Sequence, residues 1–329
     1  MKYEELNDLK KTNPPGQIIY LGARASILSR WQANYVAKKL EQSCPGLCVE
    51  TKIQSTEGDR VCEIPLPEIG GKGVFTFEIE KALLENKIDI AVHSFKDLPV
   101  ENNPGLTIAA ISERADPRDA LVSRHNYQLH SLPKGASVGT SSTRRAAQLL
   151  FLRPDLKVTH IRGNVDTRIK KAFDPNLDYD AIIIAYAGLV RIGLARIASE
   201  IISIEKMLPA PAQGALAIQC QENSHLIPLI NSINHIDTML ATTAERAFLR
   251  ALGGGCSLPV AALAEYVNGQ LKLMGAVYAR DGIAKIGLEQ SVSCEAANLE
   301  EALLKAGELG KQLAALALSK GADKLLESV

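Results

Sequence analysis

The sequence lacks several features that mark particular classes of protein. Its 37 lysine and arginine residues are balanced by 37 aspartate and glutamate residues, so the chain has no overall positive field that would hold nucleic acid. No apolar run has the length of a membrane span. Neither G-x-x-x-x-G-K nor G-x-G-x-x-G occurs, so no phosphate-binding loop for a nucleotide is indicated. We expect a protein with no nucleic-acid or membrane partner.

Cysteine pairs with metal-binding spacing are also missing. The six cysteines are scattered and none forms a C-x-x-C pair, so no metal site is expected. A chain of 329 residues needs no disulfide bonds for stability, and most of the cysteines are typical of small buried apolar residues. Cys256 differs, because three glycines precede it in "LGGGCSLP" (252–259) and predict an exposed, adaptable turn. The alternative is that Cys256 is a loop cysteine with no chemical role.

The N-terminal segment "MKYEELNDLKKTNPPG" shows no targeting signal. It lacks the apolar core of a signal peptide, and Glu4, Glu5 and Asp8 argue against a transit peptide. We expect a short polar tail and a cytoplasmic protein.

Strand-like apolar runs alternate with helical patterns over most of the chain. Strands are expected at 17–21, 88–92, 137–140, 181–185 and 215–220, and helices at 29–42 and 75–87. This alternation predicts parallel sheets with helices on their faces. From about residue 236 the pattern changes to one helix, two hairpin-like strands around Asn268-Gly269 and an Ala/Leu-rich helix at 298–319. That part predicts a smaller α+β unit.

The segment "AVHSFKDLPV" (91–100) turns abruptly from apolar to charged. A buried strand ends at His93 and Ser94, and Lys96 and Asp97 follow directly. In open α/β sheets, binding and catalytic residues usually lie at the carboxyl ends of the strands. Lys96 and Asp97 are therefore candidate functional residues.

Arginines recur where strands give way to helices, at Arg24, Arg144, Arg145, Arg162, Arg168 and Arg191. Ser142 is a candidate helix N-cap before two of them, and Ser26 lies close after the first strand. A cation at a helix start is unfavourable for the helix dipole unless an anion is bound there. Guanidinium groups bind carboxylates and phosphates bidentately. One such arginine is most often a solvated surface charge, but the set predicts a pocket for a ligand with several negative charges.

A glycine-rich stretch, "GGKGVF" (70–75), lies between a predicted strand and a predicted helix. Glycines around Lys72 are typical of a mobile loop. An ordinary surface loop is the alternative.

Longer motifs carry a resemblance to a known family. In order along the chain they are "GGKGVF", "AVHSFKDLP", "ERADPRDALVS", "VGTSSTRRAAQL", "IRGNVDTR", "DAIIIAYAGLVRIGL", "AQGALAIQC" and "AERAFLRALGGGCS". From Ile18 onward the chain resembles the porphobilinogen deaminases, also called hydroxymethylbilane synthases.

This resemblance implies an α/β fold of two periplasmic-binding-protein-like domains plus a smaller α+β C-terminal domain. The expected boundaries are 17–113 with 214–234 for the first domain, 114–213 for the second and 235–329 for the third. The active site of such proteins lies in the cleft between the first two domains. The family resemblance also suggests a monomer.

The resemblance further implies a transferase of tetrapyrrole biosynthesis. It would condense four porphobilinogen molecules head to tail and release ammonia each time. A dipyrromethane cofactor would be attached to Cys256 through a thioether, and Asp97 would be the catalytic carboxylate beside the azafulvenium cation. Cofactor-binding positions would be Lys96, Arg144, Arg145, Arg162, Ser142 and Ser26, and substrate-binding positions Arg24, Arg168, Arg191, Lys72 and Gln213.

Five positions depart from the pattern that family members commonly show. Ala23 stands where threonine is usual, Glu68 where lysine is usual and Thr143 where leucine is usual. Gly253 replaces a glutamate before the cysteine, and Ala212 replaces a glycine. We expect these changes to affect rate, loop rigidity and cofactor packing, because the charged candidate residues are all kept.

Two other functions are compatible with parts of the sequence. A two-lobed anion receptor or effector-sensing protein would share the architecture, since a fold does not determine a function. Such a protein needs neither Cys256 nor Asp97. A nucleotide-dependent transferase would need a phosphate loop that the sequence lacks.

Overall fold

The computed structural model describes residues 18–54, 76–101, 103–255 and 258–327. The chain divides into two compact units, the first formed by residues 1–114 and 215–236 and the second by 115–214 and 237–329. Glu68, Lys72 and Cys256, which were named above from the sequence, lie outside the described residues.

The first unit is built on one five-stranded sheet with the order β2-β1-β3-β10-β4. β1 pairs in parallel with β2 and β3, whereas β10 runs antiparallel to both β3 and β4. The strands are β1 (Ile18–Arg24), β2 (Cys48–Gln54), β3 (Ile90–Ser94), β4 (Leu106–Ile111) and β10 (Leu216–Gln221).

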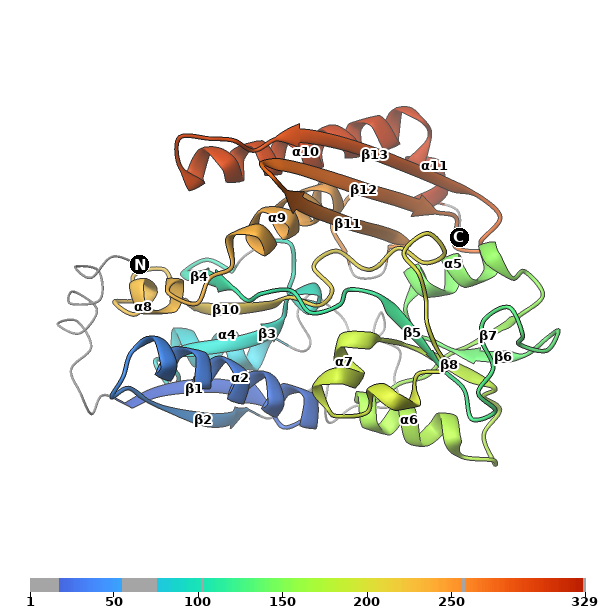
Figure 1. Ribbon diagram of the computed structural model, residues 1–329, viewed down its shortest axis with the longest axis horizontal. Helices are drawn as coiled ribbons and strands as arrows, with labels where there is room; N and C mark the ends of the chain where they lie inside the picture. The colour runs from blue at the N-terminus through green and yellow to red at the C-terminus, as the bar shows by residue number, and fades with distance from the viewer. Residues whose placement is uncertain (1–17, 55–75, 102, 256–257, 328–329) are drawn as a thin grey trace. The chain divides into compact units, whose positions relative to one another are not determined.

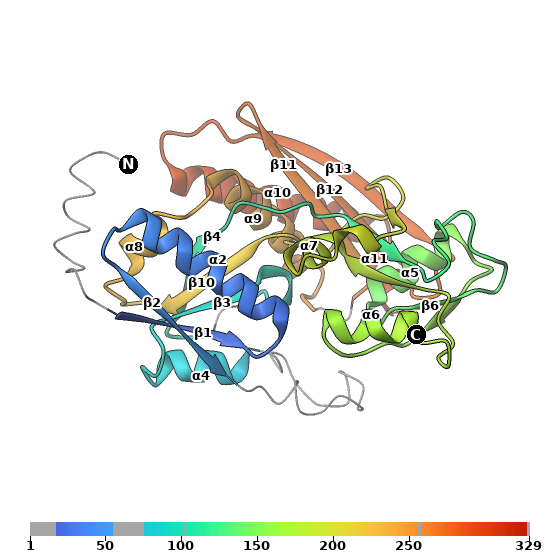
Figure 2. The same ribbon diagram turned by 60° about the horizontal axis from the view of Figure 1, so that its bottom comes forward.

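Helices cover both faces of this sheet because β1 alternates its side chains between them. Ile19, Leu21 and Ala23 pack with α2 (Ile27–Ser43) and α8 (Ile227–Asn231). On the other face, Tyr20 packs with the helix α4 (Phe77–Leu84). Figure 1 shows α2 lying along the sheet, and Figure 2 shows α4 on the side of β1 opposite to α2.

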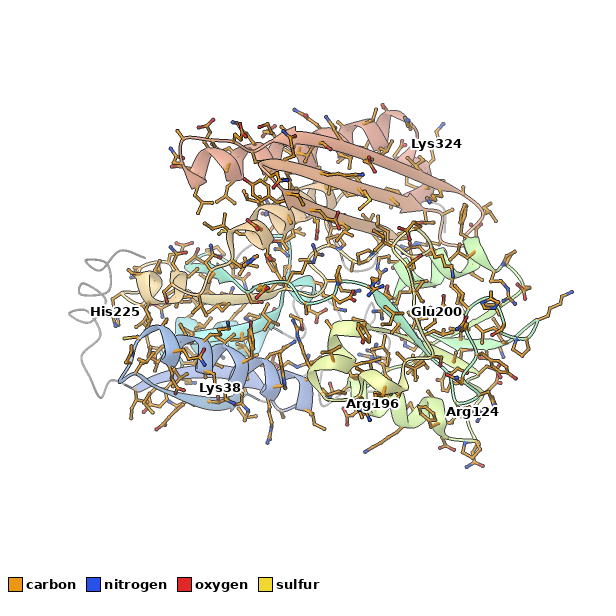
Figure 3. The ribbon with its side chains drawn as sticks, in the orientation of Figure 1. Lys38, Arg124, Arg196, Glu200, His225 and Lys324 are labelled. Atoms are coloured by element: carbon orange, nitrogen blue, oxygen red, sulfur yellow. The ribbon has the colours of Figure 1, made fainter. Side chains whose placement is uncertain are left out.

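The second unit contains a five-stranded sheet of matching order, β7-β6-β8-β5-β9. β6 pairs in parallel with β7 and β8, and β5 runs antiparallel to β8 and β9. Glu200 of the edge strand β9, labelled in Figure 3, accepts a hydrogen bond from the Leu129 N–H at 2.6 Å and pairs with Lys206 at 3.0 Å. The elements are β5 (Asp119–Val122), β6 (Ser137–Gly139), α5 (Thr143–Leu152), β7 (Lys157–Thr159), α6 (Val165–Phe173), β8 (Ala181–Ala185), α7 (Tyr186–Arg191), the 3-10 turn η2 (Ala195–Ile197) and β9 (Glu200–Ile201).

A three-stranded antiparallel sheet, β11-β12-β13, completes the second unit. Phe248, Leu271 and Leu313 share one hydrophobic core between this sheet and its helices. On the other face of this three-stranded sheet, Ala147 of α5 packs against Ala261 and Ala276. The elements are α9 (Ile236–Ala251), β11 (Val260–Val267), β12 (Gln270–Tyr278), β13 (Lys285–Ser293), α10 (Leu299–Ser319) and α11 (Ala322–Glu327).

The mixed α/β architecture agrees with the expectation from the sequence, but two details differ. The predicted parallel pairing holds among β2, β1 and β3 and among β7, β6 and β8, but the fourth strand of each five-stranded sheet, β10 or β5, is antiparallel. These strands enter from the other unit rather than through a helical crossover within their own sheet. The C-terminal α+β part also has a third strand, β13, that was not predicted. Its residues alternate between exposed and half-buried, and few of them are apolar, so the strand pattern is weak in the sequence.

The turn at Asn268-Gly269 does join β11 to β12, and both residues have positive φ angles of 51° and 79°. Within the described residues, no helix is both long and apolar enough to cross a membrane.

Candidate active site

Asp97 lies at the end of the buried strand β3. The chain leaves the sheet in a 3-10 turn, η1 (Phe95–Asp97), in which Phe95 is buried and its N–H donates to the Ala215 carbonyl at 3.1 Å. Because Phe95 is held inside, the following Lys96 is half-buried and Asp97 is exposed. The sequence prediction that a charged turn follows a buried strand is confirmed.

Buried polar contacts support β3 just before this turn. The Gln32 amide donates to the Ser94 hydroxyl at 2.8 Å, and His93 Nε2 lies 3.0 Å from Gln219 Oε1. The Gln219 nitrogen donates to Glu80 at 3.0 Å, so its oxygen is left to accept from the imidazole. With the Gln219 amide oriented in this way, His93 donates from Nε2 to its oxygen.

The pKa of His93 is lowered to about 4, mainly because the ring is buried. The Gln219 hydrogen bond opposes this shift, and the charge of Arg24 adds to it. Arg24 is the last residue of β1, and its N–H donates to the Ser29 hydroxyl at 2.9 Å. Ser26 is the N-cap of α2 and accepts from the Ser29 N–H at 3.2 Å.

Arg144 and Arg145 lie in the first turn of α5, after the N-cap Ser142. Both are buried, and both contact the buried carboxylate of Asp119 on β5. Arg145 donates from Nε and Nη2 to Asp119 Oδ1 at 3.1 and 2.7 Å. Arg144 Nη2 lies 2.8 Å from Oδ2 in an ion pair without hydrogen-bond alignment, and its Nε has no hydrogen-bond partner among the described residues.

Asp119 is the internal counter-ion of this pair. Burial alone would raise the pKa of its carboxyl group, but the charges of Arg144 and Arg145 and the hydrogen bonds from Arg145 and Gln213 hold it well below its usual range. Gln213 is itself completely buried, and its amide nitrogen donates to Asp119 at 2.9 Å. Arg144 and Arg145 therefore share an internal counter-ion, which the sequence argument for an anion at helix starts did not include.

Arg191 also differs from the sequence expectation. It closes α7 rather than opening a helix, and its Nη2 donates to the Gly214 carbonyl at 2.6 Å. A cation in this last turn is favourable for the helix dipole.

Arg162 and Arg168 flank the start of α6. Arg168 Nε donates to the Gly163 carbonyl at 2.7 Å, and one terminal nitrogen of Arg162 is buried with no hydrogen-bond partner in the described part of the chain. The pKa of the nearby His160 is lowered, first by burial and then by the charges of Arg162, Arg168 and Lys171. This end of the second unit is thus positively charged, as an anion site requires.

Sequence reasoning missed Asp119 and the polar partners of His93. Asp119 was visible inside the quoted motif "ERADPRDALVS", but nothing in its spacing paired it with arginines more than twenty residues away. Gln219 and Glu80 lie on β10 and α4, which only the sheet order brings to His93.

Comparison with known proteins decides the family. A family model described as "Porphobilinogen deaminase, dipyromethane cofactor binding domain" matches residues 19–228, and one described as "Porphobilinogen deaminase, C-terminal domain" matches 239–319. The chain belongs to the porphobilinogen deaminase family.

Curated relatives agree with this membership over nearly their whole length. The porphobilinogen deaminase of Syntrophomonas wolfei is 47% identical over 93% of this chain and 97% of its own. Those of Pelobacter propionicus and Geobacter metallireducens are each 45% identical, over 96% and 94% of this chain and 98% and 94% of theirs. Among solved structures, the methionine binding protein MetQ is 13% identical over 66% of this chain and 89% of that chain, with a TM-score of 0.42.

The residues of the family's dipyrromethane-binding domain fit a ligand rich in carboxylates. The buried Nε of Arg144 and the buried Nη1 of Arg162 are donors that still lack hydrogen-bond partners among the described residues. Buried donors left in this state are costly, and a carboxylate oxygen is the acceptor that a guanidinium binds best.

Proposed function

We propose that this chain condenses four porphobilinogen molecules head to tail into hydroxymethylbilane, with release of ammonia at each step. The observation that carries the proposal is the match of the dipyromethane cofactor binding domain to residues 19–228. The residue roles that follow are part of the same proposal and draw on the geometry of each unit.

Asp97 is assigned as the catalytic carboxylate. Departure of the aminomethyl nitrogen of porphobilinogen leaves a cation on the substrate, and a fixed carboxylate stabilises that cation without reorganising. The buried Phe95 anchors the turn of Asp97 to the end of β3 and leaves the carboxylate exposed. The same carboxylate can take up the proton lost when the pyrrole carbon has been attacked.

The arginines are assigned to the acetate and propionate groups of the pyrroles. Arg144, Arg145 and Arg162, with Lys96, Ser142 and Ser26, are proposed to hold the cofactor. Arg24, Arg168, Arg191, Lys72 and Gln213 are proposed to act on the substrate. Arg144 and Arg162 are the best supported, because each keeps a buried N–H donor unused. Arg145 and Gln213 make their described hydrogen bonds inside the second unit, so we expect them to act by holding Asp119 and the neighbouring arginine in place.

Cys256 is proposed to carry the dipyrromethane through a thioether. When bound, this group supplies the terminal pyrrole carbon from which the chain grows. We further propose that 17–113 with 214–234, 114–213 and 235–329 form three domains, and that the protein acts as a cytoplasmic monomer without nucleic-acid or membrane partners. Gel filtration with light scattering tests the oligomeric state.

The deciding experiment is the intact mass of the purified chain together with its consumption of porphobilinogen. We expect the mass of two pyrrole units beyond that of the polypeptide, and its loss in Cys256→Ser. Cys48→Ser is the matched control, because Cys48 is an exposed cysteine elsewhere in the chain. An unmodified parent chain that leaves porphobilinogen untouched would favour the anion receptor instead.

A further inference from the structure

Glu245 is a completely buried carboxylate in the middle of α9. Its Oε2 accepts from the Ala212 N–H at 2.6 Å, and its Oε1 accepts from the Ala264 N–H at 2.7 Å. Both oxygens are needed as acceptors, so a glutamine could satisfy only one of these two donors and would direct an NH₂ group at the other.

The Ala212 contact fixes an unusual backbone conformation. Ala212 has a φ of +61°, which costs free energy in any residue with a side chain and is adopted readily only by glycine. A buried residue keeps such a conformation only when its surroundings hold it there. Glu245 supplies the hydrogen bond that does this at the residue itself.

The next residue connects this turn to the arginines. Gln213 donates from Nε2 to the Pro117 carbonyl at 2.7 Å and to Asp119 at 2.9 Å. Asp119 in turn is the counter-ion of Arg144 and Arg145. Glu245 is therefore joined to both guanidinium groups through the Ala212–Gln213 peptide bond followed by hydrogen bonds and ion pairs.

Backbone carbonyls on either side of Ala212 and Gln213 also bind arginines directly. We call residues 208–214 the arginine-holding segment. The Leu208 carbonyl accepts from Arg144 Nη1 at 2.7 Å, and the Gly214 carbonyl accepts from Arg191 Nη2 at 2.6 Å. β11 adds a second anchor, because the Ala262 N–H donates to the Pro209 carbonyl at 3.1 Å.

We propose that Glu245 is a positioning residue: by fixing the left-handed turn at Ala212, it sets the arginine-holding segment, and with it the guanidinium groups of Arg144, Arg145 and Arg191. The proposal rests on the proposed function, in which these arginines bind pyrrole carboxylates. It gives α9 an indirect role in ligand binding, through the arginines. In the sequence α9 ends at Ala251, shortly before Cys256, so the helix that sets the arginines also leads into the proposed attachment point.

The test compares Glu245→Gln with the parent by steady-state kinetics on porphobilinogen. Small displacements of binding groups can change rates and affinities by up to about 100-fold, and we expect KM to rise roughly 10-fold or more while kcat per folded molecule changes less. Intact mass gives a second measurement, because we expect a smaller fraction of the variant to carry the two pyrrole units. A purely structural Glu245 would lower the amount of folded protein and leave KM unchanged.

A rescue variant separates positioning from general damage. Ala212→Gly removes the conformational cost at the turn, so Glu245→Gln/Ala212→Gly should regain most of the parent KM and cofactor content. Asn126→Gly is the matched control, because Asn126 has a φ of 55° in the same unit but belongs to an exposed turn. If Glu245→Gln does not fold, the milder Glu245→Asp, which shortens the side chain but keeps both acceptor oxygens, is measured in its place by the same KM criterion, alone and with Ala212→Gly.

Three results would overturn it: a folded Glu245→Gln with a KM within about twofold of the parent, a rescue by Asn126→Gly equal to that by Ala212→Gly, or a double variant that does not fold or keeps the raised KM. The first result with an active, cofactor-bearing parent rejects only the role of Glu245. A parent without the added mass and without turnover rejects the proposed function as well.

Discussion

Asp97 is exposed at the end of β3 in the first unit, whereas Arg144 and Arg145 are buried in the first turn of α5 in the second. The acid is placed by its backbone: a buried strand and a buried Phe95 leave the carboxylate outside. The two arginines are placed by other side chains, because Asp119 and Gln213 hold them from within.

This difference separates the contribution to catalysis from the contribution to stability. An exposed charge adds little to the free energy of folding, whereas removing one partner of a buried ion pair leaves an uncompensated charge. Changes at Asp97 should therefore affect the rate alone. Changes around Arg144 and Arg145 should affect stability and ligand binding together.

The largest effect is expected at Asp97. Asp97→Asn keeps the shape of the side chain but removes its charge and its capacity to take up a proton, which costs roughly 10²–10⁴ in rate. The thermal unfolding curve should stay within experimental error of the parent, since the side chain is exposed. Asp178→Asn is the control, because Asp178 forms an exposed ion pair with Lys157 and should alter neither property. A folded Asp97→Asn with normal turnover would remove Asp97 from the mechanism.

Asp119→Asn should give the opposite combination. Without the carboxylate, Arg144 and Arg145 remain as two buried like charges, and we expect the free energy of unfolding to fall by about 3–5 kcal/mol. The depressed pKa of Asp119 means that its contribution is present above the usual carboxyl pKa and is lost as the pH falls through its folded-state value. Urea unfolding at pH 7 measures the loss. An unchanged midpoint would show that the pair contributes nothing.

His93 makes the stability of the first unit depend on pH. Its pKa is about 4 in the folded chain against an ordinary value near 6.5, so below pH 6.5 the unfolded chain takes up a proton that the folded chain does not. The parent should lose about 2 kcal/mol of stability at this residue between pH 7 and pH 5. His93→Asn should flatten that part of the stability curve, whereas His130→Asn, at an exposed histidine, should leave it unchanged. Equal slopes in all three proteins would contradict the buried neutral ring.

The smallest effect is expected at Ala212. Ala212→Gly relieves a positive φ in the second unit, and the gain is partly offset by the larger freedom of glycine in the unfolded chain. We expect an increase of at most about 1 kcal/mol in the free energy of unfolding, with turnover unchanged. Chemical denaturation of the parent and the variant side by side measures it. A clear loss of stability would mean that the methyl group packs too well to be removed.

Much of the candidate site could be predicted from local sequence. The strand before His93, the charged turn at Asp97 and the N-cap Ser142 depend on neighbours in the chain, and the structure confirms each of them. The β-hairpin at Asn268-Gly269 is local in the same way.

The partners of the arginines could not be predicted in this manner. Asp119 reaches Arg145 only because β5 enters the sheet beside β8, and this order follows from the return of the chain between the two units. The antiparallel direction of β5 has the same origin. Sequence spacing carries no information about such pairings.

The sequence by itself determined the alternation of strands and helices, the exposed acid after β3 and the family, because hydrophobic period, capping and turn residues act over a few positions. Only the tertiary structure decided that Arg144 and Arg145 have an internal counter-ion, that Gln213 is buried, and that Glu245 holds the turn at Ala212. The physical reason is burial: a charge or amide removed from water must find its partner wherever the fold provides one, however distant along the chain.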